Sequence, residues 1–111
     1  MITKDYVSRE TYKLLKEKGY DGEFKTCYDT EGYTYPAIHL YDAMKWLREA
    51  HKIDIDIISR LSLNADDDHC YSYILKHQYD KYHYKTYIDG EYLKFEEACK
   101  AAIKYCLENL I

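Results

Sequence analysis

Apolar residues recur three and four positions apart in several stretches of the chain, the spacing that places them on one face of a helix. This periodicity predicts helices over residues 5–18, 39–51 and 95–110. The expected buried stripes consist of Val7, Thr11, Leu14 and Leu15, then of Leu40, Ala43, Met44, Leu47 and Ala50, and finally of Phe95, Ala98, Cys99, Ala102, Ile103, Cys106, Leu107 and Leu110. Each helix should therefore pack one apolar face on the rest of the domain.

Residues at the expected helix ends fit capping roles. Asp5 or Ser8 can cap the first helix at its N-terminus, and Gly19 follows it where a left-handed residue often ends a helix. His51 ends the second helix, where a cationic imidazole would interact favourably with the helix dipole. These features support the helix boundaries and assign no chemistry to the side chains involved.

A period of two, typical of a half-buried strand, is clearest over residues 53–58, where isoleucine alternates with aspartate. Two further strands are expected over residues 70–77 and 82–88, and Asp89-Gly90 is expected to form the turn that closes the last one. A short hairpin is plausible around the turn-like residues 29–32. Together these patterns predict a set of sequential antiparallel strands.

The expected order is helix, hairpin, helix, three strands, helix. This order describes an α+β fold, a two-layer sandwich in which a three-stranded or slightly larger antiparallel sheet packs on helices. A chain of 111 residues has the size of one domain, so we expect a single domain over residues 1–111.

Strand parity divides the side chains of the expected sheet between two faces. The inner face should hold Ile53, Ile55, Ile57, Tyr71, Tyr73, Leu75, Tyr82, Tyr84 and Ile88. The outer face should hold Asp54, Asp56, Ile58, Cys70, Ser72, Ile74, Lys76, His83, Lys85 and Tyr87. Scattered apolar residues are normal on a surface, but a cluster rimmed by charge is typical of an interaction site. We therefore predict a partner-contact face formed by Ile58, Cys70, Ile74 and Tyr87 with Asp54, Asp56 and Lys85.

Composition limits the class of protein. Fifteen tyrosines stand against two phenylalanines and one tryptophan, which favours strands with amphipathic rims. The net charge of −4 argues against nucleic acid as the main partner. The first residues form no apolar leader and no stretch has the length of a membrane span, so a cytoplasmic protein with reduced cysteines and no membrane partner is expected.

Metal-ligating residue types occur in the second half of the chain without the spacing of a metal site. His69, Cys70, His77 and His83 lie close in sequence, but they lack a C-x-x-C or H-x-x-x-H pattern, and parity puts Cys70 and His77 on opposite faces. The acidic residues 66–68 lack the glycine and glutamate of an EF-hand loop. We expect no metal and no cofactor.

A catalytic role is also not expected. Asp54 and Asp56 share a strand face at roughly 7 Å, as a carboxylate pair would, but outward aspartates on a half-buried strand serve solubility. Phosphate-binding glycine loops and nucleophile-elbow motifs are absent from the sequence. The chain is therefore expected not to be an enzyme.

Two segments carry a family resemblance. They are the Trp46-Leu-Arg-Glu-Ala-His51 helix end running into residues 53–57, and the terminal Phe95-Glu-Glu-Ala helix that finishes in Leu110-Ile111. With the tyrosine-rich strands, these segments resemble a group of small uncharacterised proteins of Bacteroidetes genomes and their phages or prophages. The resemblance implies a bacterial or phage cytosolic setting, and it carries over no functional residue.

These observations favour a non-enzymatic protein-interaction module that contacts a protein partner or forms a homodimer through the outer sheet face. An alternative is nucleic-acid binding, since the order helix, three strands, helix resembles the double-stranded RNA-binding fold. That fold needs lysines at the start of its last helix to reach phosphates, whereas this chain has Lys94, Phe95, Glu96 and Glu97 there.

Overall fold

The computed structural model describes residues 6–61, 69–78, 80–81 and 83–111. Along this part of the chain the elements are α1 (Arg9–Glu17), β1 (Lys25–Tyr28), β2 (Thr34–Ala37), α2 (Leu40–His51), β3 (Ile53–Leu61), β4 (His69–Gln78), β5 (Tyr84–Tyr92) and α3 (Phe95–Tyr105), which continues as a π-helix over Cys106–Leu110. In the same residues β1 and β2 form a two-stranded antiparallel hairpin, and β3, β4 and β5 form a three-stranded antiparallel sheet in that order. The α+β class and the expected order of elements are confirmed.

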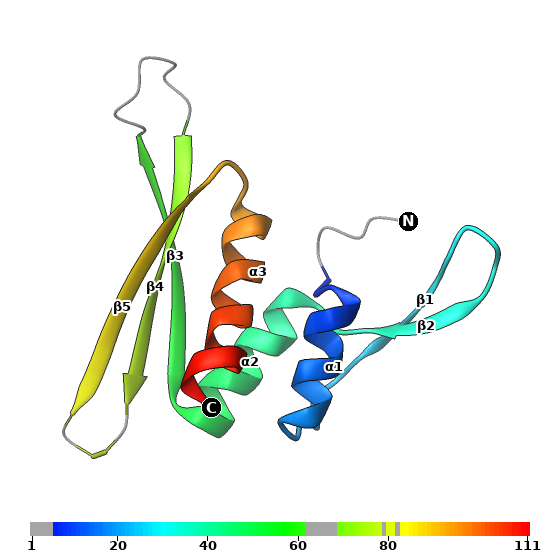
Figure 1. Cartoon of the computed structure of the whole chain (residues 1–111), viewed down its shortest axis with the longest axis horizontal. Helices are drawn as coiled ribbons and strands as arrows, with labels where there is room; N and C mark the ends of the chain where they lie inside the picture. Colours follow the sequence, from blue (N-terminus) through cyan, green and yellow to red (C-terminus); the bar gives the residue numbers. More distant parts are fainter. Residues whose placement is uncertain (1–5, 62–68, 79, 82) are drawn as a thin grey trace.

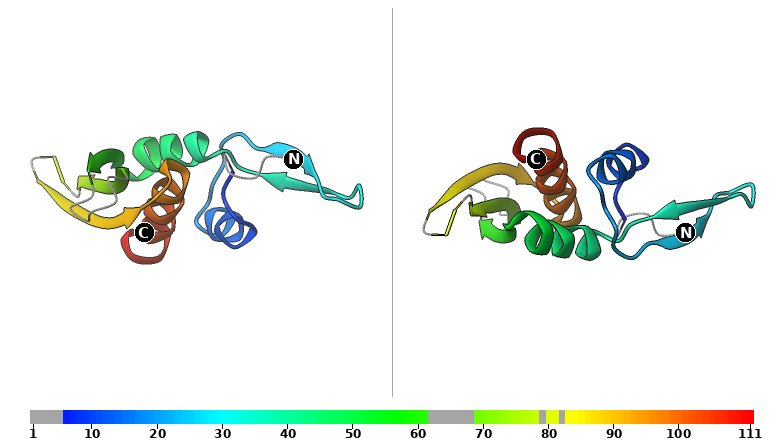
Figure 2. Two further views of the ribbon diagram at one scale, coloured as in Figure 1. Left: turned by 90° about the horizontal axis from the view of Figure 1, so that it is seen from above. Right: turned by 90° about the horizontal axis from the view of Figure 1, so that it is seen from below.

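The two sheets lie at opposite ends of the molecule, with the helices between them (Figure 1). Seen along the perpendicular direction, the β1–β2 hairpin again projects away from the helices (Figure 2). The molecule is flat, with extents of 43 × 43 × 17 Å, and its radius of gyration of 15.2 Å exceeds the roughly 13 Å of a compact domain of this length. The fold therefore leaves much of its surface uncovered.

The core lies between the helices and one face of the β3–β4–β5 sheet, which we call the inner face. Ile53 and Leu75 are fully buried there, and the ring of Tyr73 is 2 % exposed. The Tyr105 ring of α3 contacts both Tyr73 and Tyr87, with centroids 6.4 and 5.9 Å apart. The predicted inner positions on β3 and β4 are confirmed, because the helical stripe of α3 and its π-helical continuation packs on them (Ala98, Cys99, Ala102, Ile103, Cys106 and Leu107 are buried). The predicted stripe was wrong at Phe95, which is 48 % exposed at the start of the helix.

Strand β5 corrects the sequence prediction in two ways. Tyr87 pairs with Leu75 and lies on the inner face, whereas Ile88 pairs with Ile74 and is 63 % exposed on the other side. The prediction had these two residues exchanged. Asp89-Gly90 is not a closing turn, since β5 continues to Tyr92.

The register of β5 shifts at this point, because Tyr73 pairs with Asp89 and Tyr71 with Tyr92. One additional residue on β5 is a β-bulge, and a bulge re-aims the side chains that follow it. Tyr92 is thereby returned to the inner face, where its ring stacks on that of Tyr73 at 6.2 Å. Two other predicted inner positions near the start of this strand lie outside the described residues, Tyr82 as a whole and Tyr84 in its side chain.

Helix α1 begins four residues later than residue 5, the expected start, because the chain before it is extended. Tyr6 bridges to His39, and the Val7 amide donates to the Ile38 carbonyl at 2.9 Å. The helix then starts after Ser8, whose hydroxyl accepts from the Thr11 amide, so Ser8 is the cap, while the other candidate, Asp5, lies outside the described residues.

The β1–β2 hairpin is held by its turn. The Asp29 carboxylate accepts hydrogen bonds from the Glu31 and Tyr33 amides, both at 2.9 Å, and Gly32 takes a φ of +88°. This arrangement confirms the hairpin that residues 29–32 suggested. Pro36, which has no amide hydrogen, lies in β2, as expected of a strand at a sheet edge.

Helix α2 is capped by His39, whose Nδ1 accepts from the Tyr41 amide at 3.0 Å. Its buried residues include Trp46, which the predicted stripe omitted, while Ala50 is exposed. The His51 ring packs edge-on against Trp46 with centroids 4.7 Å apart. Burial, with a smaller contribution from His77, lowers the pKa of His51, so the expected cationic cap at the helix end is disfavoured.

Candidate interaction surface

The face of the β3–β4–β5 sheet turned away from α3 is defined by strand register. This outer face consists of Asp54, Asp56, Ile58, Ser72, Ile74, Lys76, Thr86 and Ile88. Antiparallel pairing sets Asp54, Lys76 and Thr86 in one row and Asp56, Ile74 and Ile88 in the next, because residues opposite one another share a face. Ile58 lies opposite Ser72, diagonally next to Ile74.

The apolar residues of the outer face are continuous across the sheet. Ile88 is 63 % and Ile58 37 % exposed, and Ile74 between them is half-buried. Asp54, Asp56 and Lys76 are exposed around this isoleucine diagonal. The arrangement is an apolar centre with charges of both signs at its margin, the pattern of an interaction surface.

Several of the residues predicted for this surface do lie together on it, namely Asp54, Asp56, Ile58 and Ile74. Tyr87 does not, as it packs against Tyr105 on the inner face. Lys85 is exposed, but its position also belongs to the inner face. It pairs with His77, and His77 pairs with the buried Ile53, so all three share one row of the sheet.

Three other outer-face predictions have different outcomes. Cys70 belongs to β4, but its side chain lies outside the described residues. Ser72 occupies its predicted row yet is fully buried. His83 precedes β5 and its Nδ1 lies 2.8 Å from the Asp80 carboxylate, so it is part of the β4–β5 connection and not of the sheet face.

The sequence pattern did not place Thr86 and Ile88 on this surface. It also did not predict that basic residues gather at one end of the outer face, which we call the basic end. Arg48 and Lys52 from the end of α2 join Asp54, Lys76 and Gln78 around a hollow of about 500 Å³. Lys52 is brought there by its left-handed backbone (φ 59°), which ends α2 and starts β3. The sequence shows Lys52 between the predicted second helix and the following strand. Its position beside Lys76 depends on the register of the strands, which the sequence does not give.

Among the described residues, the residue types considered for catalysis or metal binding are not assembled into a site. The acidic residues 66–68 and the side chains of His69 and Cys70 lie outside the described residues, and the described ones contain no cluster of three or more metal-ligating side chains. Asp54 and Asp56 stand exposed on an open face. Burial raises the pKa of the Cys99 thiol to about 11 and that of the Cys106 thiol to about 12, which keeps both thiols protonated and unreactive.

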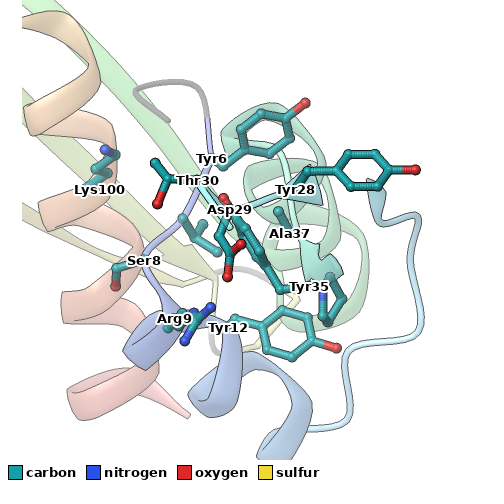
Figure 3. Close-up of a pocket in the computed structure, with 12 residues that line it drawn as sticks. Tyr6, Ser8, Arg9, Tyr12, Tyr28, Asp29, Thr30, Tyr35, Ala37 and Lys100 are labelled. Atoms are coloured by element: carbon teal, nitrogen blue, oxygen red, sulfur yellow. The ribbon is translucent and has the colours of Figure 1, made fainter. Parts of the chain in front are cut away.

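A second recess borders the β1–β2 hairpin. It is an open groove of about 580 Å³ between the start of α1, the β1–β2 hairpin and α3. Figure 3 shows Lys100 of α3 on one side of it and Tyr28 of β1 on the other. In the part of the chain that the structure describes, the aromatic residues lining it are Tyr6, Tyr12, Tyr28 and Tyr35. These tyrosines come from four separate segments, and no sequence pattern linked them.

Comparison with known proteins adds no family. No family model matches the chain, and neither a curated protein nor a solved structure matches it significantly. Among the described helices, none combines the length and the apolar character that crossing a bilayer requires. The end of the second predicted helix and the terminal helix carry the resemblance to a group of Bacteroidetes and phage proteins. This resemblance therefore stays a prediction.

Proposed function

We propose that this protein is a non-enzymatic protein-interaction module that self-associates through the outer face of its β3–β4–β5 sheet. The observation that carries the proposal is the isoleucine diagonal of Ile58, Ile74 and Ile88, which no described element covers. The cytoplasmic, phage- or prophage-type setting implied by the sequence resemblance belongs to the same proposal.

The exposed surface of the whole molecule supports a partner. The chain exposes 7659 Å², whereas a compact monomer of its 13.4 kDa mass exposes roughly 6,500 Å². Burying apolar surface stabilises an association by about 25 cal/mol per Å² before the entropic costs are counted. Covering the outer face would remove part of this excess together with its isoleucines.

A second copy fits the charges of this face. A two-fold contact brings the same patch to both sides, so the patch must complement itself. Asp54 and Asp56 on β3 supply negative charge, and Lys76 with Arg48 and Lys52 at the basic end supplies positive charge. A face-to-face packing that places the acids of one copy over the lysines of the other pairs these charges around an apolar centre.

The size of the face sets the expected strength. Nine residues of β3 span about 30 Å, and three strands are about 14 Å wide, so the flat footprint is roughly 400 Å² per copy. This footprint is about half of the roughly 800 Å² that each partner buries in a standard interface. A weak dimer that dissociates on dilution through the micromolar range is therefore expected.

Sedimentation velocity across that concentration range tests the proposal. The informative variant is Ile88→Asp, which places a charge at the β5 end of the isoleucine diagonal, at a position that is 63 % exposed and so tolerates the change in the monomer. Leu93→Asp is the matched control, because Leu93 is 72 % exposed and lies outside the outer face. Wild type and Leu93→Asp should sediment as concentration-dependent dimers, and Ile88→Asp as a monomer.

A wild type that remains monomeric throughout, or an Ile88→Asp variant that dimerises like Leu93→Asp, would remove this proposal. Ile74→Asp adds a stronger disruption at the half-buried middle of the diagonal. Circular dichroism must accompany that variant, because a charge at a half-buried position also threatens the fold.

The alternative is duplex RNA binding, and its support is the order α2, β3, β4, β5, α3. Against it, the first turn of α3 carries Glu96 and Glu97, and its cap Lys94 is the one lysine among residues 94–97. Salt-dependent binding of labelled duplex RNA at low ionic strength would support this alternative, and absence of binding there would exclude it.

A further inference from the structure

We propose that the groove between α1, the β1–β2 hairpin and α3 binds a nucleotide, that is, a planar aromatic base that carries a phosphate. The groove shares no lining residue with the outer face, and the β1–β2 hairpin that borders it lies at the opposite end of the molecule from the β3–β4–β5 sheet (Figure 1). Its volume of about 580 Å³ lies within the range of roughly 300–1,000 Å³ that small-molecule sites occupy.

The aromatic wall provides a stacking surface. Tyr28 is 62 % exposed and makes no ring contact with another described aromatic side chain. It extends from β1 at the rim of the groove (Figure 3). A base can therefore stack on the Tyr28 ring, an interaction that tolerates any base because each presents a π-face.

Two lining residues provide positive charge. Arg9 of α1 and Lys100 of α3 both line the groove, and neither forms an ion pair with a carboxylate of the described residues. The Arg9 guanidinium stacks 5.1 Å from the centre of the Tyr35 ring, which orients it while leaving its charge unneutralised. Two cations from different helices that line one aromatic groove suit a phosphate.

The carboxylate in the groove does not oppose an anion as strongly as its charge suggests. Asp29 Oδ1 already accepts hydrogen bonds from the Glu31 and Tyr33 amides at 2.9 Å each. Hydrogen bonds from backbone amides offset part of its negative potential and hold the side chain in the turn.

An extended peptide fits the groove less well. Pro36 removes one amide donor from β2, and Tyr6 and Val7 already pair along His39 and Ile38. Strand addition to β2 would need those edge groups. Among the described residues, Val7, Pro36 and Ala37 are the aliphatic side chains that line the groove, and they are small, so these residues form no pocket for a large aliphatic side chain.

The overall charge decides between a free nucleotide and a long strand. A net charge of −4 repels an extended polyanion, whereas two local cations suffice for the phosphate of one nucleotide. A free nucleotide is therefore the expected ligand, and a short single strand is the other source of the same chemistry.

Fluorescence anisotropy of a labelled adenine nucleotide with the full-length protein tests the site, with labelled oligothymidylate as a second probe. Tyr28→Ala should weaken binding by about tenfold or more, because it removes a stacked base. Tyr33→Ala is the matched control, since Tyr33 is 69 % exposed on the same hairpin and does not line the groove. Lys100→Gln should weaken binding and flatten its salt dependence, whereas Lys45→Gln on α2 should do neither.

Competition by unlabelled nucleotide against both probes supports a free-nucleotide site, and competition by the oligonucleotide alone supports a single-strand site. No binding of either probe at low salt would overturn the proposal. So would equal losses for Tyr28→Ala and Tyr33→Ala, because the groove would then not be the place of binding. Repeating the titration with Ile88→Asp separates this site from self-association, since that variant leaves the groove intact.

Discussion

Tyr20 shows how the fold changes the chemistry of a single residue. Its side chain is 4 % exposed, its ring packs edge-on against Trp46 at 5.5 Å, and its hydroxyl donates to the Glu23 carbonyl. Burial raises the pKa of Tyr20 from 10.0 to about 12, and the Asp42, Glu23 and Asp21 carboxylates add to the effect. The folded state therefore holds the phenolic proton more tightly than the unfolded chain.

This pKa predicts a loss of stability in alkali. Between pH 10.0 and about 12 the unfolded chain has lost the Tyr20 proton and the folded chain keeps it, so the free energy of unfolding falls as pH rises, by up to roughly 2–3 kcal/mol. Tyr20→Phe should lose about 1 kcal/mol at neutral pH through its missing hydrogen bond, and it should lose less stability than wild type in alkali. Urea unfolding at neutral pH and at about pH 11 measures both effects. Equal alkaline losses in the two proteins would contradict the assignment, since every other titrating group is shared.

At the scale of elements, the end of α1 depends on one backbone conformation. Gly19 takes a φ of +93°, and the Gly19 and Tyr20 amides donate to the Lys16 and Leu15 carbonyls at 3.1 and 2.9 Å. These two bonds form a Schellman motif, which ends the helix and turns Tyr20 into the core. No atom outside the neighbouring residues lies within 4 Å of the place where a Cβ would stand, so the requirement is conformational and not steric.

Gly19→Ala should therefore destabilise the protein by roughly 1–2 kcal/mol, the cost of a left-handed conformation for a residue with a Cβ. Gly19→Asn should cost clearly less, because asparagine tolerates this conformation. Chemical denaturation of the two variants beside wild type gives the comparison. Equal costs for alanine and asparagine would mean that the loss has another origin.

Strand β5 shows where sequence reasoning about elements stops. Tyr87 and Ile88 are adjacent and both apolar, so alternation alone assigns neither to the core. A shift of one residue sends every side chain of a strand to the other face. Pairing with β4 and the contact of Tyr87 with Tyr105 decide the matter. The alternation of isoleucine and aspartate on β3 has no such ambiguity, and its predicted faces are confirmed.

For the whole molecule, the projecting hairpin sets the shape. Cys27 and Ala37 are the buried residues of its two strands, while Tyr28 is largely exposed. A two-stranded hairpin has little stability of its own, so its orientation relies on the turn at Asp29 and on the pairing of Val7 with Ile38.

The shape predicts a scattering result. The Ile88→Asp variant is expected to be monomeric. After the contribution of the hydration layer is subtracted, its radius of gyration should be near the 15.2 Å of the structure. A compact 111-residue domain would give roughly 13 Å. Small-angle X-ray scattering at low concentration distinguishes the two, and the smaller value would mean that the hairpin folds back onto the helices in solution.

The sequence by itself determined the order of the elements, the α+β class, the faces of β3 and the stripe of the last helix apart from exposed Phe95, because apolar periodicity and local capping act over a few residues. Only the tertiary structure decided which side of β5 faces the core, how Arg48 and Lys52 come to lie beside Lys76, and how tyrosines from four segments line one groove. These features depend on strand register and on packing between residues far apart in the chain. A period of two or of 3.6 within one segment carries no information about either.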